Sequence, residues 1–337
     1  MRGLGAAPDR GADGEETALA TPASVGRLVP LATLGEQARA YAEEGHAATT
    51  RRAYGADWRA FVAWCDERGL AARPAASTTL ALYLTDQAEV LKTSTLQRRL
   101  AAIAQAHRLK GHASPTEDAA FRAVWRGIRR AKGTAQVGKA ALLTNDVRAL
   151  VLVLDLEKPI GVRDRALLLL GFAGAFRRSE LVALDVGDVQ TTRDGLVVTI
   201  RRSKTDQLGE GAKIGIPRGR HAGTCPVRAL AAWLERAGIA AGPIFRGVDR
   251  HGRILPGRLT DRAVALIVQR TAASAGLDPA QFAGHSLRAG LATSAAMAGA
   301  EERDIMRQTR HTSVAVARRY IRDGSLFRNN AAATAGL

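Results

Sequence analysis

The chain has 337 residues, 46% of them hydrophobic, which is enough to bury a substantial core and to form two domains. Its 49 Lys and Arg residues against 32 Asp and Glu residues leave a formal net charge of +17. This charge favours a polyanionic partner such as nucleic acid, although a generically basic protein would share it. The longest apolar run, residues 166–176, is too short to span a bilayer, and the amino terminus has no apolar signal region. Cys65 and Cys225 have no paired spacing and predict free thiols. We therefore expect a cytoplasmic protein without a membrane partner.

Composition and periodicity divide the chain into four segments. Residues 1–30 are rich in Gly, Ala, Asp and Pro without periodicity, which predicts a disordered tail. Residues 31–132 carry helical patterns and predict a small helical domain. A linker is predicted at residues 133–141. Residues 142–337 mix helical and strand-like stretches and predict a second, α+β domain.

The helices of the first domain are expected to combine apolar stripes with basic edges. In residues 49–68, Trp58, Phe61 and Cys65 recur at steps of three and four, which predicts an amphipathic helix. Further helices are predicted over residues 77–90, 93–109 and 116–132. Such a domain can clamp DNA, but an ordinary helical bundle with a solvated basic surface explains the pattern equally well.

In the second domain, a nearly wholly apolar helix over residues 164–176 is expected to be central. Strands are predicted at residues 196–202, 213–217 and 244–245. The other predicted helices cover residues 144–154, 226–237 and 258–275, and three short helices cover 284–322.

Several polar residues of the second domain are candidates for chemistry. His285 and Arg288 are three residues apart, so they share one face of a helix. His311 is predicted to open the last helix, which also carries Tyr320. Taken singly, each of these residues is more simply explained by packing or by a solvated charge. No group of His, Cys or acidic residues has metal-ligand spacing, so we expect neither a metal nor another cofactor.

A cationic pocket with one tyrosine suits nucleophilic attack on a phosphodiester without a metal ion. Neighbouring arginines and a histidine base favour loss of the phenolic proton. Two guanidinium groups can neutralise the charge that gathers on the nonbridging oxygens. A lysine on a mobile turn can protonate the departing 5′ oxygen. The 3′-phosphotyrosine product keeps the phosphoester bond, so strands can be rejoined without ATP.

These residues resemble the motifs of the tyrosine recombinase (phage integrase) family, and in particular its Cre-like members. Residues 175–181, AFRRSEL, are similar to the motif that holds the first family arginine, and Glu180 resembles the supporting acid. Residues 202–205, RSKT, fit the turn that carries the family lysine, and residues 285–290 are similar to the H-x-x-R box. Phe176 and Arg178 depart from the usual pattern without removing a catalytic group. The resemblance implies six catalytic positions: Arg177, Lys204, His285, Arg288, His311 and Tyr320.

The resemblance also implies a fold and a set of DNA contacts. The fold is expected to be mainly α with a small β-sheet, with an N-terminal helical SAM-like core-binding domain and a C-terminal α+β tyrosine-recombinase catalytic domain. Residues predicted to contact DNA are Arg51, Arg52, Lys92, Thr93, Arg126, Arg129, Arg130 and Arg262.

The function implied is site-specific recombination or integration of double-stranded DNA at inverted-repeat core sites, as on a mobile element. Tyr320 would form a 3′-phosphotyrosine, and strands would then be exchanged through a Holliday junction. The protein is expected to be a monomer or weak oligomer when free and a homotetramer on synapsed DNA. The alternatives are a relaxing topoisomerase, a hairpin-forming resolvase, a catalytically silent DNA-binding protein of the same fold, and a general basic nucleic-acid binder. The last of these does not explain the order of the six residues.

Overall fold

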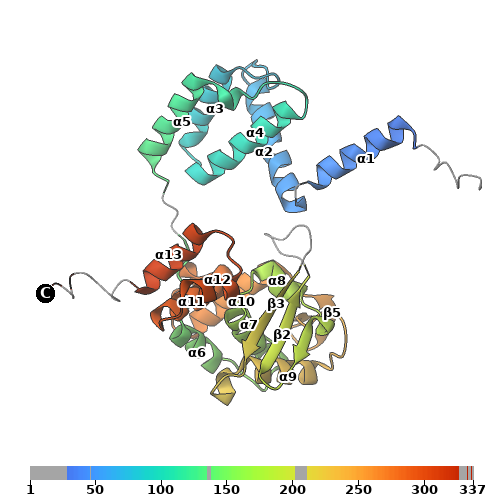
Figure 1. The fold of residues 1–337 in the computed structure, drawn as a ribbon, viewed down its shortest axis with the longest axis vertical. Helices are drawn as coiled ribbons and strands as arrows, with labels where there is room; N and C mark the ends of the chain where they lie inside the picture. The colour runs from blue at the N-terminus through green and yellow to red at the C-terminus, as the bar shows by residue number, and fades with distance from the viewer. Residues whose placement is uncertain are drawn as a thin grey trace, which may run out of the picture. The chain divides into compact units, whose positions relative to one another are not determined.

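The computed structural model describes residues 29–45, 47–134, 138–201 and 211–325, together with Ala332 and Ala335. The chain divides into two compact units, residues 1–134 and 135–337, which are drawn in Figure 1. All but the last two residues of the predicted tail lie outside the described residues.

The first unit is helical. Its core is aromatic: Phe61 and Tyr83 are fully buried and their rings meet edge to face, with centroids 4.9 Å apart. Polar groups beside this core are paired, since Trp64 Nε1 donates to Asp86 at 2.8 Å. The apolar stripe predicted for residues 49–68 therefore faces the core, as expected for an amphipathic helix. The elements are α1 (Leu31–Glu44), α2 (Ala48–Asp66), α3 (Ser77–Ala88), α4 (Thr93–Arg108), a 3₁₀ turn (Pro115–Glu117) and α5 (Ala119–Lys132).

The second unit combines helices with two small antiparallel sheets (Figure 1). Its helices are α6 (Thr144–Leu152), α7 (Pro159–Ala173), α8 (Arg178–Ala183), α9 (Pro226–Ala237), α10 (Asp261–Ser274), α11 (His285–Met297), α12 (Glu302–Thr309) and α13 (Val314–Ser325). Its strands are β1 (Val189–Thr191), β2 (Gly195–Ile200), β3 (Ala212–Pro217), β4 (Arg246–Val248) and β5 (Ile254–Arg258). Short 3₁₀ turns cover Val186–Asp188, Ala222–Thr224 and Pro279–Gln281.

Helix α7 lies in the core, because residues 166–170 are all buried and no stripe of the helix is left for solvent. Helix α9 packs against it, and Trp233 Nε1 of α9 donates to the Ile244 carbonyl at 2.8 Å. In the three-stranded sheet, with order β1-β2-β3, buried Val198 of β2 lies opposite buried Ile214 of β3. Alternate residues of both strands face the core, which explains the period of two in their sequences.

The mainly helical fold with a small sheet is confirmed, but some predicted boundaries are wrong. The strand expected at residues 244–245 begins instead at Arg246, because the Ile244 amide donates to Leu184 and the Phe245 carbonyl accepts from Leu259. The helix expected from Arg258 begins at Asp261, since Arg258 belongs to β5. Strands β1 and β5 were not predicted. Within the described ranges, every helix is too short or too polar to cross a bilayer.

Candidate active site

Helix α11 places two predicted catalytic residues, with His285 as its first residue and Arg288 one turn later. The helix is seated tightly: a Cβ added to Gly290 would lie 1.8 Å from the Leu142 carbonyl oxygen, and the Leu142 amide donates to the Ser286 carbonyl at 3.0 Å. Any side chain at position 290 would therefore displace the helix. This packing fixes the direction in which Arg288 leaves the backbone.

Arg288 is a buried cation, with 1% of the residue exposed. Its Nη1 donates to the Ala175 carbonyl at 2.8 Å, whereas its Nη2 is buried without a hydrogen-bond partner among the described residues. Burial, reinforced by the nearby charges of Arg177 and Arg310, lowers the pKa of Arg288 to about 9. A buried donor without an acceptor is costly, and an anionic oxygen would satisfy it. Arg288 thus has the properties of an anion ligand.

Glu180, three residues into α8, returns to cap the backbone amide of Arg177 at the start of the helix. The Arg177 amide donates to Glu180 Oε2 at 2.9 Å, and Arg177 Nη1 donates to Glu180 Oε1 at 2.6 Å. Burial would raise the pKa of the Glu180 carboxyl, but the charges of Arg310 and Arg177 outweigh burial and hold this pKa below its usual value. Glu180 therefore remains an anion that orients two guanidinium groups.

Tyr320 lies on α13, where its hydroxyl is 2.8 Å from His285 Nε2. The ring of His311 is stacked on the Tyr320 ring, with centroids 5.7 Å apart and an interplanar angle of 22°. Helix α13 rests on α11 and α12 through a small apolar cluster whose fully buried members are Ala292, Ala296 and Ile305. The nucleophile candidate is therefore held by one histidine at its oxygen and by another at its face.

His311 lies in the turn between α12 and α13, and not at the start of the last helix as predicted. The turn forms because Arg310 adopts the left-handed conformation after Thr309, which ends α12. Thr309 Oγ1 donates to the Ile305 carbonyl at 2.7 Å and also contacts His311 Nδ1 at 2.7 Å. Since a carbonyl only accepts, the hydroxyl proton lies on that side and Nδ1 of His311 must carry its own proton. Nε2 of a neutral His311 then keeps its lone pair.

The pKa of His311 is lowered to about 4, first by burial and then by the charges of Arg288 and Arg177. The imidazole is therefore neutral at pH 7. Because the folded-state pKa lies below the ordinary value near 6.5, the unfolded chain binds a proton that the folded chain does not. His311 consequently stabilises the fold above about pH 6.5, and this contribution is lost as the pH falls toward 4.

We expect the free energy of unfolding of wild type to fall more steeply between pH 6.5 and pH 4 than that of a His311→Asn variant. The difference should reach about 1–2 kcal/mol, after allowing for solvent screening at a half-buried ring. Urea unfolding of both proteins at several pH values measures it, since all other titrating groups are common to the pair. Parallel curves would contradict a neutral, buried His311.

The structure brings five of the six predicted catalytic residues together. Arg177, His285, Arg288, His311 and Tyr320 interact with one another by contact or by charge. The sixth, Lys204, lies outside the described residues. The predicted DNA contacts Arg51, Arg52, Lys92, Arg126, Arg129, Arg130 and Arg262 are exposed, and Thr93 is half-buried.

Sequence reasoning missed Arg310, whose side chain reaches Glu180 at 2.9 Å and the Ala175 carbonyl at 3.1 Å. The sequence around it contains several arginines, including Arg307 and Arg318. No spacing distinguishes Arg310 from these neighbours. The position of Arg310 directly before His311 is the one feature of the sequence that could have drawn attention to Arg310.

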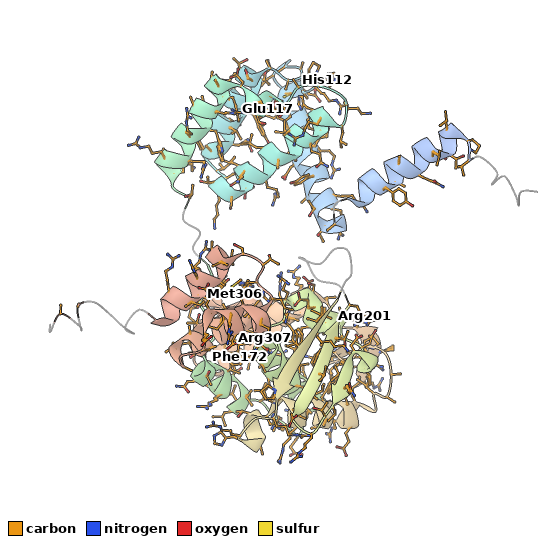
Figure 2. All side chains as sticks on the ribbon, viewed as in Figure 1. His112, Glu117, Phe172, Arg201, Met306 and Arg307 are labelled. Atoms are coloured by element: carbon orange, nitrogen blue, oxygen red, sulfur yellow. The ribbon has the colours of Figure 1, made fainter. Side chains whose placement is uncertain are left out.

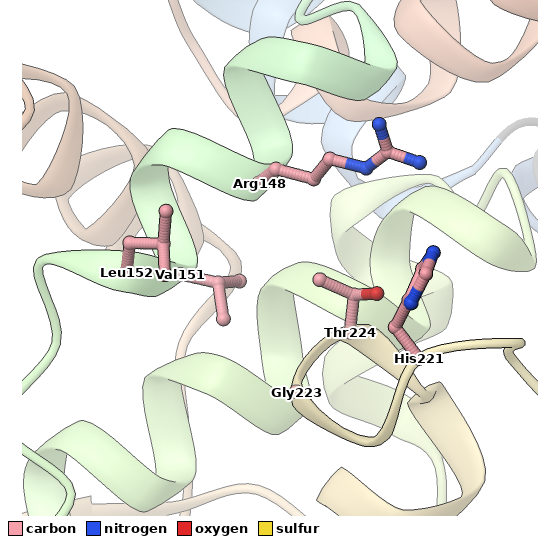
Figure 3. Close-up of a pocket in the computed structure, with 6 residues that line it drawn as sticks. All are labelled: Arg148, Val151, Leu152, His221, Gly223 and Thr224. Atoms are coloured by element: carbon pink, nitrogen blue, oxygen red, sulfur yellow. The ribbon is translucent and has the colours of Figure 1, made fainter.

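A separate hollow of about 330 Å³ opens beside the end of α6 (Figure 3). Arg148, His221 and Thr224 supply polar groups, and Val151 and Leu152 supply an apolar wall. None of the five clustered residues lines it. It is therefore distinct from the candidate active site.

Comparison with known proteins identifies the class of protein. The model of the phage integrase family matches residues 140–325. The integrase/recombinase xerD homolog of Selenomonas ruminantium is 44% identical over 301 residues, which cover 88% of each chain. Recombinase cre of Escherichia phage P1 is 26% identical over 286 residues, or 79% of this chain and 81% of its own.

A solved structure shares the fold. A lambda integrase dimer bound to a COC′ core site matches with a TM-score of 0.60 at 16% identity, covering 89% of this chain and 78% of that chain. The chain belongs to the phage integrase family, and the predicted resemblance to tyrosine recombinases is confirmed.

Proposed function

We propose that this tyrosine recombinase is a site-specific recombinase of double-stranded DNA in which Tyr320 is the nucleophile. The observation that carries the proposal is the 2.8 Å contact between the Tyr320 hydroxyl and His285 Nε2, beside the buried and partly unpaired guanidinium of Arg288. A hydroxyl in contact with a base and next to an anion ligand is the arrangement that attack on a phosphodiester needs.

In the proposed reaction, His285 Nε2 accepts the phenolic proton as Tyr320 Oη attacks the phosphorus. Arg288 Nη2 and the guanidinium of Arg177 bind the nonbridging oxygens, where negative charge accumulates. The 5′ oxygen leaves with a proton from Lys204, and the 3′ phosphate stays bound to Tyr320. Attack by a 5′ hydroxyl from another strand reverses these steps, so neither ATP nor a metal ion is required.

The substrate-binding roles extend to both units. We assign residues 31–132 as the helical core-binding domain, 133–141 as the linker and 142–337 as the catalytic domain. The exposed basic residues of α5, Arg126, Arg129 and Arg130, are suited to the phosphate backbone, as is Arg262 of α10. A lambda integrase tetramer bound to a Holliday junction has a similar fold, with a TM-score of 0.56 at 16% identity. This similarity supports a tetramer, and we propose that it acts on paired inverted-repeat sites.

Recombination in the presence of EDTA tests the proposal. Plasmids carrying two copies of a candidate inverted repeat from beside the gene are incubated with the protein, and new DNA junctions are detected by amplification across them. We expect junction products in reactions with wild-type protein and none with the matched control variant, Tyr320→Phe. Relaxed circles or hairpins without new junctions would instead identify a topoisomerase or a resolvase. Tight binding to a selected site without any cleavage would identify a silent DNA-binding protein.

A further inference from the structure

Two residues other than glycine have positive φ angles among those described, and they contact each other. They are Ala175, with φ of 45°, and Arg310, with φ of 55°. Arg310 Nη2 donates to the Ala175 carbonyl at 3.1 Å. Non-glycine residues adopt this conformation at a steric cost, and they keep it only where the surrounding structure fixes them. Backbone strain is thus concentrated at one point of the candidate active site.

The Arg310 side chain joins two turns that are far apart in sequence. From the α12–α13 turn, its Nη1 donates to the Gln308 carbonyl at 3.0 Å and to the Gly174 carbonyl at 3.1 Å. Its Nη2 donates to Glu180 Oε2 at 2.9 Å as well as to Ala175. The side chain is 12% exposed and its Cζ lies 5.4 Å from the centre of the Phe176 ring. One planar group therefore fixes the α7–α8 turn to the turn that carries His311. Helix α12, which leads to Arg310, carries Met306 and Arg307, which are labelled in Figure 2.

Two of the four acceptors of Arg310 also accept hydrogen bonds from the two arginines proposed to bind phosphate. The Ala175 carbonyl accepts from Arg288 Nη1 at 2.8 Å, and the Glu180 carboxylate accepts from Arg177 Nη1 at 2.6 Å. Any movement of the α7–α8 turn consequently moves the partners of Arg177 and Arg288 together. Arg310 lies far from these shared acceptors in sequence, and it reaches them from the turn that positions His311.

We propose that Arg310 is a positioning residue, which locks the α7–α8 turn to the α12–α13 turn so that Arg177, Arg288 and His311 keep their places around one phosphate. Its consequence for catalysis rests on the proposed function. The role depends on the planar, forked guanidinium, because four acceptors on two turns are bridged at once. A lysine would supply the charge to one or two of these acceptors and leave the turns unlocked.

Three variants separate this role from a general effect on folding. Arg310→Gly removes the side chain and relieves the positive φ, so the two effects on stability oppose each other. Arg310→Lys keeps the charge. Arg307→Ala removes an exposed arginine of α12, the helix that precedes Arg310, and its ion pair with Asp304 spans 3.1 Å. We expect the rate of covalent adduct formation on a nicked duplex to fall about 100-fold in both Arg310 variants, with duplex affinity retained and Arg307→Ala at the wild-type rate.

Hydrogen exchange measures the locking without any DNA. In Arg310→Gly and Arg310→Lys we expect faster exchange over residues 174–180, at a melting temperature close to wild type, and unchanged exchange there in Arg307→Ala. Wild-type exchange in the Arg310 variants, or a wild-type cleavage rate in Arg310→Lys, would overturn the positioning role. If wild type itself forms no adduct, the proposed function fails, and the exchange data still decide whether Arg310 couples the two turns.

Discussion

Replacing Tyr320 with phenylalanine is expected to abolish the covalent protein–DNA adduct and to leave duplex binding close to wild type. Phenylalanine keeps the ring that stacks on His311 and loses only the oxygen that lies 2.8 Å from His285 Nε2. Loss of a nucleophile costs a rate factor on the order of 10⁶, which places the variant below detection. The measurement uses nicked duplexes that trap the adduct, incubated in EDTA and run on a denaturing gel, with binding followed on a native gel.

Tyr41→Phe is the matched control, because Tyr41 lies on α1 and is 74% exposed. It should form adduct at the wild-type rate. An adduct that persists in Tyr320→Phe, or that appears on the 5′ phosphate in wild type, would show that another residue or another polarity of attack is used.

Replacing Arg288 with methionine is expected to slow adduct formation by about 10³ to 10⁵, the range over which one arginine contributes to phosphoryl transfer. Methionine fills much of the same volume and removes the charge of Arg288, a predicted anion ligand that is 1% exposed. Burial and the charges of Arg177 and Arg310 disfavour the charged form of Arg288, as its lowered pKa shows. The variant should therefore melt at or above the wild-type temperature while its cleavage is nearly lost.

Comparing melting temperature with cleavage rate in the same preparations distinguishes a chemical role from a structural one. Arg303→Met is the control, since Arg303 is 82% exposed on α12 and pairs with Glu301. A large drop in melting temperature for Arg288→Met would mean that Arg288 holds the fold together and is not primarily a phosphate ligand.

Much of this site follows from local sequence patterns. The spacing of His285 and Arg288 places both on the first turn of α11, because i and i+3 positions share a helix face. Arg177 and Glu180 follow from the same rule, since an acid three residues into a helix returns to its first amide. The central position of α7 follows from the unbroken apolar run over residues 166–173, which leaves this part of the helix no polar face. These features depend only on neighbours along the chain.

The features that were missed depend on residues distant in sequence. Ile244 and Phe245 read as a strand, but their backbone groups bond Leu184 and Leu259, so the strand starts later. The importance of Arg310 depends on reaching Gly174 and Ala175, more than 130 positions earlier. The left-handed backbone at Ala175 and Arg310 could not be predicted from the sequence either, because neither residue type prefers this conformation. Such contacts exist only once the turns are assembled.

Helix α13 rests on a small cluster of its own, in which the buried residues are Ala292, Ala296 and Ile305, whereas the main core of the second unit runs from α6 to α11. The free energy of opening a segment scales with the apolar area that it buries, and alanines bury little. Detaching α13 therefore costs less than unfolding the unit, and it removes the proposed nucleophile, Tyr320, while the arginines proposed to bind phosphate stay in place. If these roles hold, DNA binding and DNA cleavage depend on parts of different local stability, and we expect a state in which the protein is bound to DNA but inactive.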